Sequence, residues 1–155
     1  MTLYRFLASK SPMPEAGDSG FREITKEAFE QLTEPVPYFT VPYLPDKVII
    51  IDDLTKLEQF QVVRCLQLPE DTGGQIQRPY IYELRGNVNE DYLTKLVRYL
   101  QEYVKEQDKV ELWSLWHGES VSSNQMRRLD PQNLSVEKLA FLGQYKNNCI
   151  KLWRK

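Results

Sequence analysis

One short stretch holds the residue types with which a small enzyme could work. The segment VELWSLWHGE, residues 110–119, contains two tryptophans and the only histidine of the chain, His117. Histidine changes its charge near neutral pH, so it can act as a general acid or base, and Glu119 follows two residues later. Ligands often bind where strands end, which makes the pair a candidate polar site. The simpler interpretation is a buried strand, because a histidine without a surrounding motif seldom identifies a catalyst.

Two neighbouring carboxylates form the other half of this candidate site. Asp52 and Asp53 follow the apolar run VIII, and paired carboxylates can hold Mg²⁺. Adjacent side chains of a strand point to opposite faces, so the two share one ion only if the chain has already turned. Aspartate is also common at the start of turns, which is again the simpler interpretation. Catalysis would require these aspartates or Cys65 to approach His117, and we predict no catalytic residue, no metal and no cofactor.

Two other short motifs are better explained by local structure. The segment SVEK, from Ser135 to Lys138, fits the S-x-x-K pattern of some serine enzymes, but the S-D-N and K-T-G motifs that accompany it are missing. Ser135 is expected to cap a helix. The segment DTGGQ, residues 71–75, lacks the spacing of phosphate-binding loops, so its glycines are expected to form a turn between strands.

Aromatic residues mark a candidate interaction surface. The segment EPVPYFTVPYLP, residues 34–45, alternates prolines with aromatics, and proline favours a stiff, extended arm. Such an arm could present its aromatics to a partner or fold back as a lid on the core. Further tyrosines occur along the helix expected at residues 89–107. The candidate contact residues are Tyr38, Phe39, Tyr43, Tyr92, Tyr99 and Tyr103.

Composition is that of an ordinary globular protein. The chain has 155 residues, with 41% hydrophobic and 27% charged residues, which suits a single globular domain over residues 1–155. The longest apolar runs have four residues, too few for a membrane span, and the N-terminus has no apolar stretch of a secretory signal. We expect a cytoplasmic protein without a membrane partner. Its two cysteines, Cys65 and Cys149, are expected to be reduced.

Charge is unevenly distributed along the chain. The net charge of −2 argues against nucleic acid as a partner. Residues 126–155, however, carry seven basic and two acidic side chains, a local net charge of +5 that leaves −7 for the rest. The basic segment could orient a charged partner, or its lysines could simply protect an edge strand from pairing.

Hydrophobic periodicity predicts an α+β protein. The spacing of apolar residues indicates strands at 2–9, 47–54, 60–68, 78–86, 110–116 and 147–155, and helices at 23–32, 89–107 and 136–143. The strand at 47–54 is expected to be buried on both faces, and the last strand to lie at an edge. Residues 80–116 read as a βαβ unit. We predict a two-layer sandwich, with one mixed sheet of about six strands and about three helices.

Two functions from different classes remain. The first is a small, non-enzymatic protein-interaction or regulatory module, such as a bacterial immunity-type protein, that binds another protein through the aromatic surface. The alternative is a small hydrolase or transferase that uses His117 with a carboxylate or Cys65. Binding of an apolar small molecule beneath the proline-rich arm is a weaker third option, and a homo-oligomer is left open.

Overall fold

The computed structural model describes residues 3–18, 21–31, 46–51, 53–69, 74–105, 108–116, 118–119, 121–144 and 146–153. Contacts divide the chain into two compact units. The first unit consists of Met1–Gly17 and Gln59–Lys155, and the second unit is Asp18–Glu58. Compact units of this kind need not be separate domains, so the single domain over residues 1–155 stays a prediction.

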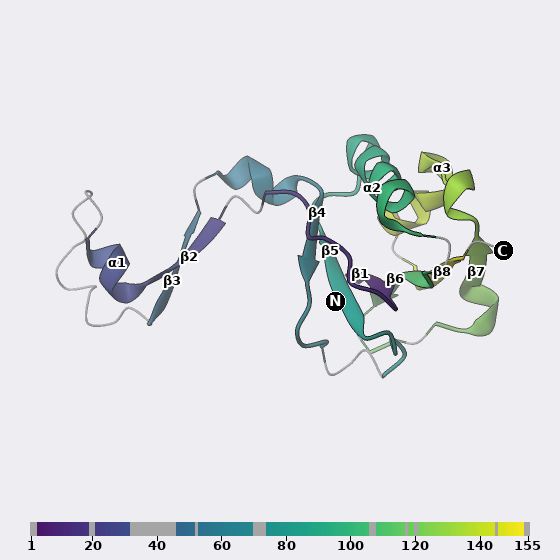
Figure 1. Cartoon of the computed structure of the whole chain (residues 1–155), viewed down its shortest axis with the longest axis horizontal. Coiled ribbons are helices and arrows are strands. Elements are labelled where there is room, and N and C mark those ends of the chain that lie inside the picture. Colours follow the sequence, from purple (N-terminus) through teal and green to yellow (C-terminus); the bar gives the residue numbers. More distant parts are fainter. Residues whose placement is uncertain are drawn as a thin grey trace. The chain divides into compact units, whose positions relative to one another are not determined.

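A six-stranded mixed sheet forms the framework of the first unit (Figure 1). In spatial order its strands are β4 (Gln61–Arg64), β5 (Tyr80–Arg85), β1 (Leu3–Ser9), β6 (Val110–Trp116), β8 (Asn148–Leu152) and β7 (Met126–Leu129). Neighbouring strands are antiparallel, except that β7 runs parallel to β8. Since β5 and β6 are both antiparallel to β1 between them, they are parallel to each other. With α2 (Glu90–Tyr103) they form the predicted βαβ unit, with one strand inserted.

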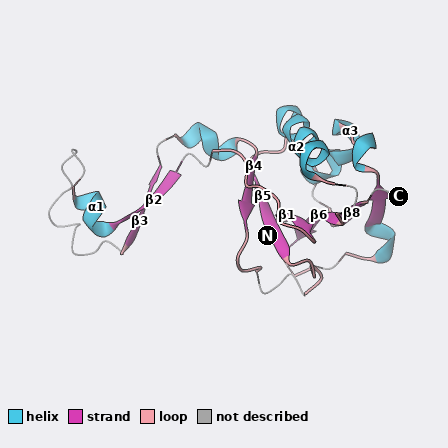
Figure 2. Ribbon diagram, in the orientation of Figure 1, coloured by secondary structure: helices cyan, strands magenta, loops and turns pink. Residues whose placement is uncertain are grey.

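Two helices lie on one face of this sheet, as Figure 2 shows. Helix α2 begins at its cap Asn89, whose side chain accepts a hydrogen bond from the Tyr92 amide at 2.9 Å. Helix α3 (Val136–Leu139) begins at the predicted cap Ser135 and continues as a 3-10 turn over Ala140–Gly143. The α2 stripe that faces the sheet is formed by Leu93, Leu96 and Leu100, together with Tyr92 and Tyr99. This arrangement confirms the α+β class with helices over the sheet.

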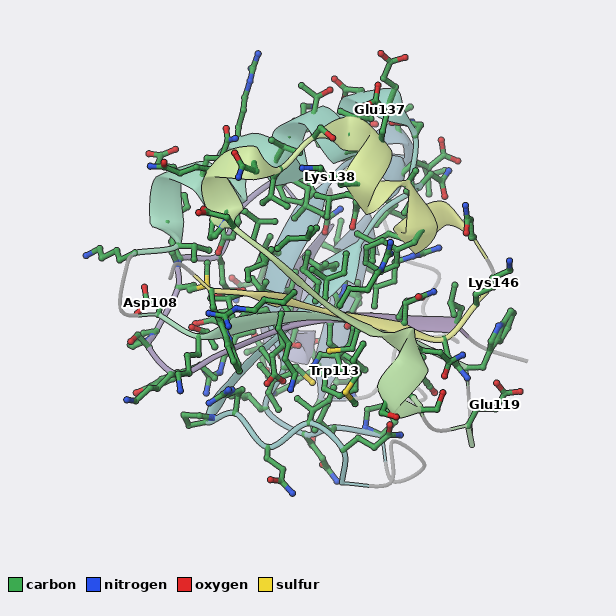
Figure 3. All side chains as sticks on the ribbon, turned by 90° about the vertical axis from the view of Figure 1, so that its right-hand side faces the viewer. Asp108, Trp113, Glu119, Glu137, Lys138 and Lys146 are labelled. Carbon is green, nitrogen blue, oxygen red and sulfur yellow. The ribbon has the colours of Figure 1, made fainter. Side chains whose placement is uncertain are left out.

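The opposite face of the sheet is covered by loops and carries a second, smaller core. Trp113 of β6 lies on this face, on the far side of the sheet from α3 (Figure 3). Ile76 and Val121, from two loops, pack there as well. The sheet is therefore buried on both sides, which explains why β6 is apolar on both of its faces.

The second unit contains much less regular structure. Strands β2 (Phe21–Thr25) and β3 (Lys47–Ile51) pair antiparallel as a two-stranded sheet. Helix α1 (Lys26–Glu30) follows β2 directly, because the Thr25 hydroxyl caps it by accepting from the Ala28 amide at 3.1 Å. A 3-10 turn over Leu54–Glu58 completes the unit.

Three expectations from the sequence are wrong in detail. The helix expected at 23–32 begins only at Lys26, because residues 23–25 pair with β3. Strand β3 is not buried on both faces, since Ile49 is exposed and β2 is its one neighbouring strand in the described part of the chain. The last strand, β8, lies inside the sheet, because residues 126–129, expected to be irregular, form the edge strand β7 beside it.

Candidate binding surfaces

The residues of the predicted polar site fall in different parts of the chain. Glu119 belongs to the first unit and Asp53 to the second. His117 and Asp52 lie outside the described residues. The polar site therefore stays a prediction.

Both described carboxylates accept hydrogen bonds from other residues of the chain. The Oε2 atom of Glu119 accepts from Nδ2 of Asn147 at 2.5 Å, and Oδ1 of Asn147 accepts from the Trp116 amide at 2.7 Å. Asn147 thereby links Glu119 to the end of β6. Asp53 Oδ1 accepts from the amide and the hydroxyl of Thr55, at 3.0 and 2.6 Å. These bonds lower the pKa of Asp53 and start the 3-10 turn.

The two cysteines are free thiols in surroundings that keep them protonated. Burial raises the pKa of Cys65, whose Sγ donates to the Gln67 carbonyl at 3.3 Å. Burial, with a contribution from Glu111, raises the pKa of Cys149 to about 12. A nucleophilic cysteine needs the opposite shift, because the thiolate is the reactive form. Within the described ranges, no group of three or more histidine, cysteine, aspartate or glutamate side chains could hold a metal.

A polar pocket of about 350 Å³ lies on the loop-covered face of the sheet. Its floor is the buried carboxylate of Glu111, which accepts from Nε of Arg78 at 3.2 Å and from Nε1 of Trp113 at 3.0 Å. The pocket is lined by Gln75, Gln77, Arg78, Glu111, Trp113, Met126 and Lys151. Each Glu111 oxygen already has a protein donor. The carboxylate therefore serves to hold the loop around Arg78 against β6.

Two of the tyrosines expected at a surface are core residues instead. Tyr92 and Tyr99 are 1% and 5% exposed, and burial raises the pKa of both phenols. They are buried because they share the apolar stripe of α2 that faces the sheet. Tyr103 is half-buried and lines a groove of about 340 Å³ beside α2. Tyr38, Phe39 and Tyr43 lie outside the described residues.

Two of the three large apolar side chains that are exposed among the described residues belong to the second unit, where the sequence indicated burial. Ile49 of β3 is 62% exposed, and Leu54 in the following turn is 68% exposed. Among the side chains described in Asp18–Glu58, none is buried. The run VIII contains Ile49, but an apolar run by itself predicts a buried strand, so the sequence did not indicate that this side chain is exposed. We call Ile49 and Leu54 the apolar pair.

Comparisons with known proteins leave the family open. No protein-family model matches this sequence, and no curated protein and no solved structure matches it significantly. No helix among the described residues is long and apolar enough to cross a membrane. Evidence for a function therefore comes from the surfaces of this chain alone.

Proposed function

We propose that this protein is a non-enzymatic protein-interaction module, and that its second unit completes its packing on a partner protein. One observation supports this proposal above all. The second unit has a two-stranded sheet and a five-residue helix, yet none of its described side chains is buried. Its apolar pair is the natural contact point.

The energetics of the second unit favour association. An isolated pair of strands is marginally stable in water, because it has no second layer against which to bury a face. The ion pair between Lys47 and Glu23, 3.0 Å apart, is exposed and contributes little. Burying an isoleucine or a leucine side chain at an interface contributes about 1.5–3 kcal/mol. Contact with a partner would therefore add burial that the described side chains of this unit do not have.

The observed chemistry supports binding better than catalysis. Burial raises the pKa of the Cys65 thiol, and the carboxylates of Asp53 and Glu119 accept hydrogen bonds from Thr55 and Asn147. The alternative of a hydrolase or transferase that uses His117 stays a prediction, since His117 lies outside the described residues. No specific observation favours it.

Affinity capture with matched variants tests the proposal. The intact chain, a variant with Ile49→Lys and Leu54→Lys, and a control with Leu66→Lys are used to capture proteins from cells of the source organism. Leu66 is a suitable control because it is 91% exposed and belongs to the first unit. Any captured protein is then purified and titrated against all three. We expect the Kd to rise at least about tenfold for the double variant, equivalent to roughly 1.4 kcal/mol, and to stay unchanged for the control.

Hydrogen exchange of the free chain is a second test of the proposed function. We expect the amides of β2 and β3 to exchange much faster than those of β6, and to become protected when the purified partner binds. The proposal is wrong if the free chain already protects β2 and β3 as well as β6. It is also wrong if the captured protein binds the double variant as tightly as the wild type.

A further inference from the structure

The two edges of the six-stranded sheet are finished differently. At the β4 edge, the Ala16 amide donates to the Val62 carbonyl at 3.0 Å, and the Val62 amide donates back to the Ala16 carbonyl at 2.9 Å. The Arg64 amide donates to Oε2 of Glu15 at 3.1 Å. Residues 15 and 16 thus close this edge, which is how many proteins prevent further strands from pairing.

The β7 edge is open on its outer side. Within the part of the chain that the structure describes, β7 pairs only with β8. The Leu129 carbonyl faces β8, since it accepts from the Trp153 amide at 3.2 Å. Successive residues of a strand direct their backbone groups to opposite sides, so the amide and carbonyl of Arg128 face outward. An extended segment of another chain can pair with these groups.

Three cations converge on one aromatic ring next to this edge. The side-chain cations of Lys109, Arg128 and Lys151 lie 5.1, 5.1 and 5.4 Å from the ring centroid of Trp153. The ring attracts each cation, but the cations repel one another. None of the carboxylates in the described ranges lies within ion-pair distance of these three. We call these three side chains with Trp153 the cation cluster.

A cavity adjoins the same residues. Its volume is about 540 Å³, and its walls are Arg128, Leu129, Asp130, Asn133 and Trp153. Trp153 also has a buried indole Nε1 that meets no acceptor among the described residues. Arg128 thus belongs to the β7 edge, to the cation cluster and to the cavity wall. Its backbone can pair with another strand while its side chain attracts a carboxylate.

We propose that the β7 edge and the cation cluster bind an acidic, extended segment of a partner protein. The segment adds as a strand beside β7, pairs with the Arg128 backbone, and places carboxylates near Lys109, Arg128 and Lys151. Charge complementarity selects this occupant, because residues 126–155 carry a net charge of +5 in a chain of net charge −2. The inference is independent of the proposed function, since its residues belong to the first unit.

Two other occupants are less suitable. A second copy that paired through β7 would bring Arg127 and Arg128 of both chains together, and like charges opposite each other destabilise a strand pair. A nucleic acid would be repelled by the remaining chain, whose net charge is −7.

A peptide titration followed by NMR tests the inference. The probe is an acetylated octapeptide of alternating glutamate and threonine, and the matched probe has glutamine in place of glutamate. We expect the acidic peptide to shift the Arg128 amide and the Trp153 indole resonances, with a Kd on the order of 1 mM or below, and the neutral peptide to bind at least about tenfold more weakly. Binding should weaken as salt rises, because exposed charges are screened.

Charge-removing variants locate the site. Lys109→Gln, Arg128→Gln and Lys151→Gln should each raise the Kd of the acidic peptide about two- to fivefold, as expected for exposed ion pairs, and more when combined. Lys105→Gln is the matched control, because Lys105 is an exposed lysine outside the cation cluster, and should leave the Kd unchanged.

Three results would overturn the inference. The first is no shift at Arg128 and Trp153 up to about 5 mM peptide, the range of very weak binding. The second is equal binding of the acidic and neutral peptides, or of the wild type and the triple variant. The third is an eight-residue thymidine oligonucleotide that shifts the same resonances at lower concentration than the peptide, which would assign the site to phosphates. None of these results affects the apolar pair, so both proposals can fail separately.

Discussion

The two units of this protein use apolar strands in opposite ways. Strand β6, VELWSLW, includes a glutamate and a serine, yet six of its seven residues are buried. Strand β3, KVIII, is more apolar, yet its described side chains are half-buried or exposed. The difference lies in the neighbours, because β6 is paired on both edges and covered on both faces, whereas among the described residues β3 pairs with β2 alone. Apolar side chains are thus buried in β6, whereas those described in β3 stay half-buried or exposed.

The largest expected effect is a cavity in the first unit. Leu96 of α2 is fully buried against the sheet, so Leu96→Ala removes apolar contacts that the surroundings cannot replace. We expect the free energy of unfolding to fall by about 2–5 kcal/mol, measured by urea denaturation and circular dichroism. A loss below about 1 kcal/mol would mean that the first unit is loosely packed, and the contrast between the units would disappear.

A large effect is also expected at the buried ion pair. Arg78→Met leaves the Glu111 carboxylate buried with Trp113 as its remaining donor. Removing one partner of a buried pair costs up to about 3–5 kcal/mol, and the part-exposed Arg78 side chain places our expectation nearer 2 kcal/mol. Arg98→Met, at an exposed position of α2, is the control and should change stability by less than about 0.5 kcal/mol. Equal stability of both variants in urea denaturation would show that the pair is not structural.

The first unit should lose stability in alkali. Cys149 has a folded-state pKa raised from 9.0 to about 12, so the folded state holds this proton more tightly than the unfolded state. Its contribution is fully present below pH 9 and is lost as the pH rises toward 12. Urea denaturation between pH 8 and 10 should show a declining free energy of unfolding that is flatter in Cys149→Ala. Identical pH profiles would exclude this explanation.

The smallest effect is expected in the second unit. Ile49→Ala removes a side chain that is already 62% exposed, so the free energy of unfolding of the free chain should change by less than about 0.5 kcal/mol. The same change should weaken partner binding if the proposed function is correct. A loss of stability as large as that of Leu96→Ala would instead show that Ile49 is part of a folded core. The two units would then not differ in how they bury apolar strands.

Local features of the first unit were predictable because they depend on neighbours in sequence. Ser135 caps α3 as predicted, and Asn89, one of two asparagines in sequence that could cap α2, is the one that does so. The stripe of leucines predicts the buried face of α2. The βαβ unit followed from the order of its elements. Strand β7 was missed because MRRL has only four residues and two arginines, and it becomes a strand through pairing with the distant β8.

Candidate sites were harder to predict than elements. Tyr92 and Tyr99 were expected at a surface because tyrosine is common at interfaces, but their helical spacing places them in the core. The cations of the cation cluster come from three strands or their ends, namely Lys109, Arg128 and Lys151. Their spacing in the sequence therefore does not predict that they meet on Trp153. The excess of basic residues near the C-terminus was the only indication of a charged surface, and it did not show where on the fold these side chains lie.

The sequence by itself determined the α+β class, the main helix and the uneven charge. These properties follow from periodicity and composition, which each segment carries on its own. Only the tertiary structure decided that β8 is internal, that β7 is an edge strand, and that Ile49 of the run VIII stays exposed. The physical reason is that burial and strand pairing are set by which segments become neighbours, and residues far apart in the chain determine that choice.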